Sequence, residues 1–220
     1  MTTVFDVAHG DQPREAAEAA AEALLAGLLV VFPTETVYGI AGVAADPDAT
    51  AGLFAAKRRP SGLALPVMAA SAEAALELAK SDGRARALAR AFWPGPLTMV
   101  LPRSARSGRW SLGDQPDTIG LRVPDHPVAQ AILSRTPPLA VTSANLSGFA
   151  PAATLEELQG AFGDAVGVFV VQPEPLRQED NPPSTVVDLT GAEARVARAG
   201  NVKQDAIAEV IRHAQGEGTG

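Results

Sequence analysis

The chain has 220 residues, 46% of them hydrophobic and 20% charged, which is enough for one domain with a sizeable core. It has no cysteine, which excludes disulfides and thiolate chemistry, and its three histidines show no metal-ligand spacing. The net charge of −7 disfavours a broad nucleic-acid-binding face. Because the sequence has neither a signal peptide nor a long apolar run, we expect a cytoplasmic protein without membrane contact.

Helices and strands are expected to alternate irregularly along the chain. The expected order is helix 13–26, strand 28–32, helix 46–59, strand 63–69, helices 71–80 and 83–93, strands 97–102 and 118–124, helix 126–135, strand 138–143, a helix that begins at 154, strands 165–171, 184–190 and 194–199, and helix 202–215. This order lacks a strict βαβ cadence. It therefore predicts a single α/β (α+β-like) domain with a mixed, twisted sheet flanked by helices.

Local signals fix several of these boundaries. Gly27 is expected to cap the first helix, and Asp46 or Asp48 the second. Thr154 with Glu157 forms the pattern of a capping box. Pro66 within the short strand 63–69 indicates an edge strand or an irregular one.

Three polar clusters follow or interrupt these apolar elements: PTETVYG at 33–39, KRRP at 57–60 and VTSANLSG at 141–148. Each has an ordinary explanation, as turn hydrogen bonds, helix C-terminal charge or loop chemistry. Together they offer the cations and the hydroxyl and amide donors that a polyanionic ligand requires, outside the ends of strands. There is no phosphate-binding loop of the Walker type, no G-x-G-x-x-G and no nucleophile elbow.

The ordered strings FPTETVYGIAG, KRRP, FWPGPLTMVLP, TIGLRVPDHP, VTSANLSG and PSTVVDLTG resemble those of the YrdC-like threonylcarbamoyl-AMP synthases. The resemblance runs from about residue 14 to about residue 203 and is to the short, single-domain form. It implies a catalytic domain over 1–203, followed by a C-terminal helix and frayed tail over 204–220.

The resemblance also implies an activity. Such enzymes condense L-threonine, bicarbonate and ATP, with Mg²⁺ carried by the ATP, to threonylcarbamoyl-AMP and pyrophosphate. A separate transferase complex then makes N6-threonylcarbamoyladenosine at position 37 of tRNA, so contact with tRNA is expected to be indirect at most. The alternatives are a non-catalytic RNA-binding paralogue of the same fold, which the −7 charge opposes, and a carbamoyl-transfer module, whose companion domains do not fit in 220 residues.

The site residues of the family are assigned to this chain one by one, at the positions that match the family's motifs. The resemblance assigns catalysis to Lys57 and Arg59. Threonine binding falls on Thr34, Tyr38, Arg122, Thr142 and Ser184. ATP binding falls on Lys57, Arg59, Thr118, Ser143, Asn145 and Arg198, with no protein ligand to a metal. In two places the chain departs from the family pattern: Met68 stands where many members have a histidine near the threonine site, and the loop 172–184 is rich in proline.

Overall fold

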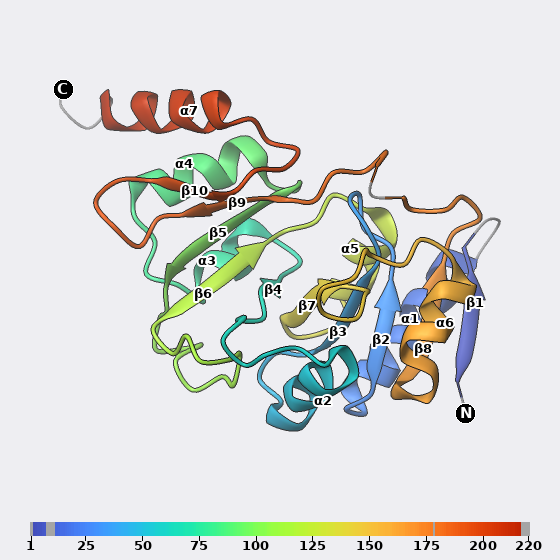
Figure 1. Ribbon diagram of the computed structural model, residues 1–220. Helices are drawn as coiled ribbons and strands as arrows, with labels where there is room; N and C mark the ends of the chain where they lie inside the picture. The colour runs from blue at the N-terminus through green and yellow to red at the C-terminus, as the bar shows by residue number, and fades with distance from the viewer. Residues whose placement is uncertain (1, 8–11, 178, 217–220) are drawn as a thin grey trace.

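The computed structural model describes residues 2–7, 12–177 and 179–216, so the expected tail lies outside the described residues apart from Gly216. Ten strands form one twisted sheet in the order β1-β8-β2-β3-β7-β4-β6-β5-β9-β10 (Figure 1). Parallel and antiparallel neighbours both occur, so the predicted mixed α/β sheet is confirmed. Within the described part of the chain, no helix combines the length and apolarity needed to cross a membrane.

The element bounds are as follows. The strands are β1 Thr3–Asp6, β2 Leu29–Phe32, β3 Gly39–Val43, β4 Val67–Met68, β5 Leu97–Pro102, β6 Thr118–Arg122, β7 Leu139–Ser143, β8 Val166–Val171, β9 Thr185–Asp188 and β10 Arg195–Arg198. The helices are α1 Gln12–Leu25, α2 Pro47–Lys57, α3 Ala72–Leu76, α4 Gly83–Phe92, α5 Pro127–Leu133, α6 Leu155–Phe162, the short 3₁₀ helix η1 Gly163–Ala165 and α7 Gln204–Gly216.

Most of the helix boundaries follow from the capping residues. Asp46 accepts hydrogen bonds from the backbone of Asp48 and Ala49, so of the two candidates it is Asp46 that caps α2. Both halves of the predicted capping box of α6 are present. Gly27, just beyond α1, has the positive φ of 81° that the expected C-cap requires.

The structure differs from the sequence-based expectation at three strands. The strands β1 and β3 were not expected. β3 reads GIAGV, which has little β-forming character, yet it lies buried between β2 and β7. A Cβ atom on its Gly39 would lie 2.7 Å from a methyl group of Val141, so the close strand contact requires glycine there. Of the two alternatives given for Pro66, the edge strand was wrong, because β4 pairs with both β6 and β7, and the irregular strand is confirmed, because β4 is only two residues long.

Two apolar clusters lie on opposite faces of the sheet. One packs α1 and α5 against β2, β3, β7 and β8. The other, larger cluster packs α2, α3, α4 and α6 on the opposite face, against the strands from β8 through β9, and α7 lies against α4 (Figure 1). Because α1 and α5 reach only one half of the sheet, no helix of the described residues covers the same face of β5, β6 and β9.

This open half is visible in the burial pattern of β5, β6 and β9. Leu97, Met99 and Leu121 point into the covered face and are fully buried. On the opposite face, Thr118 and Gly120 are only partly buried, as are Val100 and Val186. The alternation follows from the two-residue period of a strand, and it leaves a partly open platform of sheet.

Candidate functional site

The chain makes a tight turn where β2 ends, and Thr34 holds this turn together. Its hydroxyl donates to the carbonyl of Val37 at 2.6 Å and accepts from the backbone amides of Thr36 and Val37. Thr34 is only 2% exposed. Its hydroxyl group is thus engaged in the turn, and its assigned contact with threonine stays a prediction.

Tyr38 is the residue that ties this turn to the loop 172–184. The side chain is buried in the larger core, and its hydroxyl accepts a hydrogen bond of 3.0 Å from the backbone N–H of Gln172. Burial raises the pKa of Tyr38 above its ordinary value, so the hydroxyl stays protonated. The contact fixes the point at which the proline-rich loop leaves β8.

Replacing Tyr38 by phenylalanine should therefore loosen the start of this loop. A neutral hydrogen bond contributes about 1 kcal/mol, which corresponds to a fall in melting temperature of about 2–4 °C in a chain of this size. Hydrogen exchange should show faster exchange of the Gln172 amide, while the amides of β2 stay protected. An unchanged Gln172 amide would contradict the assigned role of the hydroxyl.

Lys57, the last residue of α2, is buried against the loop that carries Ser143 and Asn145, which we call the S-x-N loop. It is 1% exposed, and its amine donates to the carbonyls of Ser143 and Asn145. A third contact, to Asn145 Oδ1, is longer at 3.4 Å. Burial, helped by the nearby charge of Arg59, lowers the pKa of Lys57 to about 7.

Arg59 turns away from the helix axis because Arg58 adopts the left-handed conformation, with φ of 48°. Its guanidinium donates through Nε to the carbonyl of Leu63 and through Nη2 to that of Ala64. Burial lowers the pKa of Arg59. The side chain thus clamps the segment between α2 and β4, and its Nη1 is left available among the described residues.

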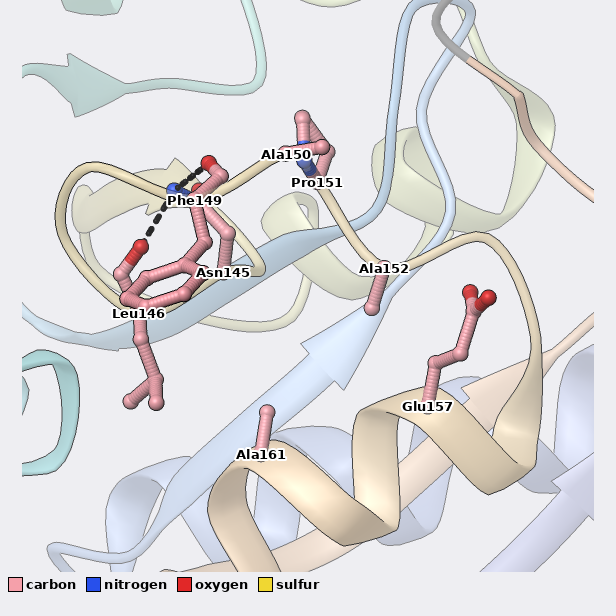
Figure 2. Close-up of a pocket in the computed structure, with 8 residues that line it drawn as sticks. All are labelled: Asn145, Leu146, Phe149, Ala150, Pro151, Ala152, Glu157 and Ala161. Atoms are coloured by element: carbon pink, nitrogen blue, oxygen red, sulfur yellow. Dashed lines mark hydrogen bonds between the residues drawn. The ribbon is translucent and has the colours of Figure 1, made fainter.

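Ser143 and Asn145 hydrogen-bond to each other, with Ser143 Oγ donating to Asn145 Oδ1 at 2.6 Å. The Asn145 amide donates to the carbonyls of Leu146 and Phe149, which closes a tight loop (Figure 2). This loop borders a shallow pocket of about 270 Å³, whose far wall is α6. Phe149 is 72% exposed at its rim.

A second group of charges lies around Arg122, at the end of β6. Arg122 Nη2 lies 2.8 Å from Glu35 Oε1 and donates to the hydroxyl of Thr36 at 3.1 Å. Both partners come from the turn after β2. Thr36 is three residues from Gly39, which pairs with Ser143. The Cα atoms of Thr36 and Ser143 are therefore at most about 16 Å apart, about 11 Å along the chain and about 5 Å between the strands.

Arg198 and Ser184 extend this second group across the sheet. Arg198 donates to the carbonyl and to the hydroxyl of Ser184, and that hydroxyl lies 2.9 Å from the hydroxyl of Thr98. Besides burial, the charge of Arg122 lowers the pKa of Arg198, which shows that the two cations are close. Their shared neighbourhood is attractive to an anion.

Thr118 lies at the start of β6, four residues before Arg122 and on the same face. The two Cα atoms are thus about 13 Å apart along the strand, a separation that only an extended ligand could bridge. Thr142 is buried on β7, in register with Ile40. Met68 pairs with Arg122 across β4 and β6, but its side chain packs in the apolar cluster of α1 and α5.

The structure brings seven of the eleven predicted residues into two groups. The first comprises Lys57, Arg59, Ser143 and Asn145, and the second comprises Arg122, Ser184 and Arg198. Within the described part of the chain, the side chains of the other four, Thr34, Tyr38, Thr118 and Thr142, form no hydrogen bond with these seven residues, and their roles stay predictions. The structure adds three residues to the second group for which the sequence predicts no role, Glu35, Thr36 and Thr98. Glu35 lies within the PTETVYG string, so an acid at a strand end was the signal for it.

The described residues offer no cluster of three or more carboxylates or histidines that could hold a metal ion. The side chains of the two groups are mainly cationic, which suits phosphate and carboxylate oxygens. A protein-held Mg²⁺ therefore does not fit these residues, whereas Mg²⁺ bound to the phosphates of a nucleotide would be compatible with them.

Residues 22–200 match the model of the Sua5/YciO/YrdC protein family. The description of that family model is "Telomere recombination". A Mycobacterium tuberculosis protein provisionally named threonylcarbamoyl-AMP synthase is 44% identical over 213 residues, which are 96% of each chain. The threonylcarbamoyl-AMP synthase of Halorhodospira halophila is 40% identical over 163 residues, 73% of this chain and 84% of the relative.

Among solved structures, Pyrococcus abyssi Sua5 complexed with L-threonine matches with a TM-score of 0.83 and 34% identity. The match covers 96% of this chain and 61% of that one, so the present chain spans less than two thirds of the archaeal protein. The structure of Escherichia coli YciO, 24% identical with a TM-score of 0.82, shares the fold.

Proposed function

This chain belongs to the Sua5/YciO/YrdC family, and we infer that it is a threonylcarbamoyl-AMP synthase that uses ATP and L-threonine. The observation that carries the proposal is the presence of two buried cations, Lys57 at the end of α2 and Arg122 at the end of β6, in two groups of polar side chains that the turn after β2 and strand β3 connect. A reaction that joins a carboxylated amino acid to a nucleotide must hold two anions close together.

We assign the two anions as the family resemblance divides the residues, which places Arg198 of the second group with the nucleotide. Arg122 would take the carboxylate of threonine, with Tyr38, Thr34, Thr142 and Ser184 shaping that end of the site. Lys57, Arg59, Ser143, Asn145, Arg198 and Thr118 would hold the nucleotide. The long 3.4 Å contact of Lys57 with Asn145 Oδ1 is the one that a phosphate or carbamate oxygen would replace most easily.

In the proposed reaction, threonine and bicarbonate give a carbamate, and the carbamate oxygen attacks the α-phosphorus of ATP to release pyrophosphate. The residues around the site supply position and positive charge. Mg²⁺ would enter on the triphosphate and neutralise part of its charge. We further propose that a transferase complex in the cytoplasm uses the product to modify tRNA.

Pyrophosphate release gives a direct test. We expect release from ATP only when L-threonine and bicarbonate are both present, with threonylcarbamoyl-AMP as the co-product in mass spectrometry. Omitting either substrate provides the control. Release of orthophosphate without threonine would contradict the proposal and would indicate an ATPase.

The alternative function, RNA binding, predicts the opposite result in this assay. A non-catalytic paralogue would bind tRNA without turning over ATP. Its binding would fall steeply with added salt, because phosphate contacts release counterions. The charge of −7 and the buried positions of Lys57 and Arg122 favour a small anionic ligand over a nucleic-acid surface.

A further inference from the structure

Buried side-chain atoms without a hydrogen-bond partner are concentrated at one place in the described part of the chain. They are Glu35 Oε1 and Oε2, Arg122 Nε and His126 Nδ1. Buried polar atoms are normally satisfied, and those that are not call for an explanation such as a ligand or a catalytic role. The three residues come from a turn, a strand end and the start of a helix that are distant in sequence.

Two of these groups, Glu35 and Arg122, are in direct contact. Glu35 Oε1 lies 2.8 Å from Arg122 Nη2, close enough for an ion pair but without the geometry of a hydrogen bond. The charge of Glu35 also acts on His126, whose pKa is lowered chiefly by burial. The side chains of Arg122 and Glu35 are only 7% and 18% exposed.

Glu35 is held in place by its neighbours in the turn. Thr34 closes the turn before it, and the hydroxyl of Thr36 after it accepts a hydrogen bond from Arg122. The carboxylate is thus fixed beside the guanidinium while both of its oxygens keep their capacity to accept hydrogen bonds. Such preorganisation suits a ligand that carries N–H donors.

An amino acid at neutral pH carries a carboxylate and an ammonium on one carbon atom, so its site needs a cation and an anion side by side. Resting on the proposed function, in which Arg122 binds the carboxylate of threonine, we propose that Glu35 binds the ammonium of threonine and accepts its proton. Glu35 is then a catalytic residue of carbamate formation, because only the neutral amine can attack bicarbonate.

The ammonium gives one proton to a Glu35 oxygen and becomes an amine. The nitrogen lone pair forms a bond to the carbon of bicarbonate and water leaves, which produces the carbamate anion. The carbamate then displaces pyrophosphate from ATP, and Glu35 returns its proton to water when the product departs.

Two other titratable groups lie near Glu35. They are Arg122, which forms the ion pair with it, and His126, whose pKa the charge of Asp125 raises. Arg198 is close to Arg122, and the hydroxyl of Tyr38 binds the backbone of Gln172. His126 is the competing base, since its Nδ1 is also without a partner. The experiment must therefore separate the roles of Glu35 and His126.

The first measurement is pyrophosphate release by Glu35→Gln, which keeps the shape of the side chain and removes its charge. We expect a loss of about 100-fold or more near pH 7.5, the usual size of general-base effects. The ratio of variant to native rates should rise by up to ten-fold per pH unit toward pH 9, because the solution then supplies the neutral amine. The matched control is Asp125→Asn, which removes the charge of an exposed carboxylate beside His126. Its rate of pyrophosphate release should stay within three-fold of the native rate.

The second measurement is the reverse reaction, ATP formation from threonylcarbamoyl-AMP and pyrophosphate. This step needs no proton from threonine, so Glu35→Gln should stay within about three-fold of the native rate. Equal losses in both directions would overturn the proposal and leave Glu35 as a structural partner of Arg122. A forward loss in His126→Gln with Glu35→Gln near native would overturn it in favour of histidine. A native protein without threonine-dependent pyrophosphate release would instead overturn the proposed function.

Discussion

Lys57→Met should lower turnover by about 100-fold, because one preorganised charge donor to the reacting groups contributes about 3 kcal/mol to transition-state stabilisation. The native amine is buried at the end of α2 and binds the carbonyls of Ser143 and Asn145. Methionine fills a similar volume, so the fold should persist, as circular dichroism can confirm. Turnover within two-fold of native in a folded variant would refute the assignment.

The same lysine predicts a distinctive pH dependence. Its pKa is about 7 in the unliganded protein, against about 10.4 for an ordinary lysine. At pH 8 about nine tenths of the amine is therefore neutral, and binding of a polyanion should draw one proton back onto it. ATP affinity should thus fall between pH 7 and 9, with proton uptake visible in calorimetry in buffers of different ionisation enthalpy. Lys57→Arg, whose charge is permanent, should lose this dependence.

The sign for stability follows from the same shift. Between pH 7 and about 10.4 the unfolded chain holds a proton on Lys57 that the folded chain lacks, so the native protein gains stability as pH rises. The melting temperature of native protein minus that of Lys57→Met should increase from pH 6 to pH 9. A constant difference would show that the amine stays charged when buried.

Arg122→Met should have the second large effect, on both substrate affinity and stability. Removing one member of a buried ion pair leaves the other charge uncompensated, at a cost of about 3–5 kcal/mol, and loss of a charged hydrogen bond should weaken threonine binding by about 10- to 100-fold. Thermal unfolding and threonine titration measure the two effects separately.

The chain offers a matched control for this pair. Arg195 lies 3.2 Å from Asp188, but its side chain is 76% exposed, so Arg195→Met should cost about 1 kcal/mol or less. Adding Glu35→Gln to Arg122→Met should recover part of the lost stability, since the unpaired carboxylate is then removed. If the double variant is less stable than Arg122→Met alone, the unpaired carboxylate of Glu35 does not destabilise the folded protein, which would contradict this explanation.

The local elements of this fold could be predicted because their signals are local. Asp46, Thr154 with Glu157 and Gly27 mark helix ends through hydrogen bonds or backbone angles within one turn of the helix. The apolar runs that become β2, β5, β7 and β8 are buried, as expected. In contrast, β3 is a strand because β2 and β7 supply its hydrogen bonds, and nothing in the local sequence GIAGV indicates this.

For the site, the sequence itself determined which residue types stand at strand and helix ends, and the family resemblance added their assigned roles. Only the tertiary structure decided what each side chain contacts. Asn145 uses its amide to close its own loop, and Arg59 clamps two carbonyls. Glu35 meets Arg122, 87 residues away, through the packing of the turn after β2 against the end of β6. Such contacts depend on which strands become neighbours in the sheet, and strand neighbours are fixed by burial over the whole chain rather than by any local pattern.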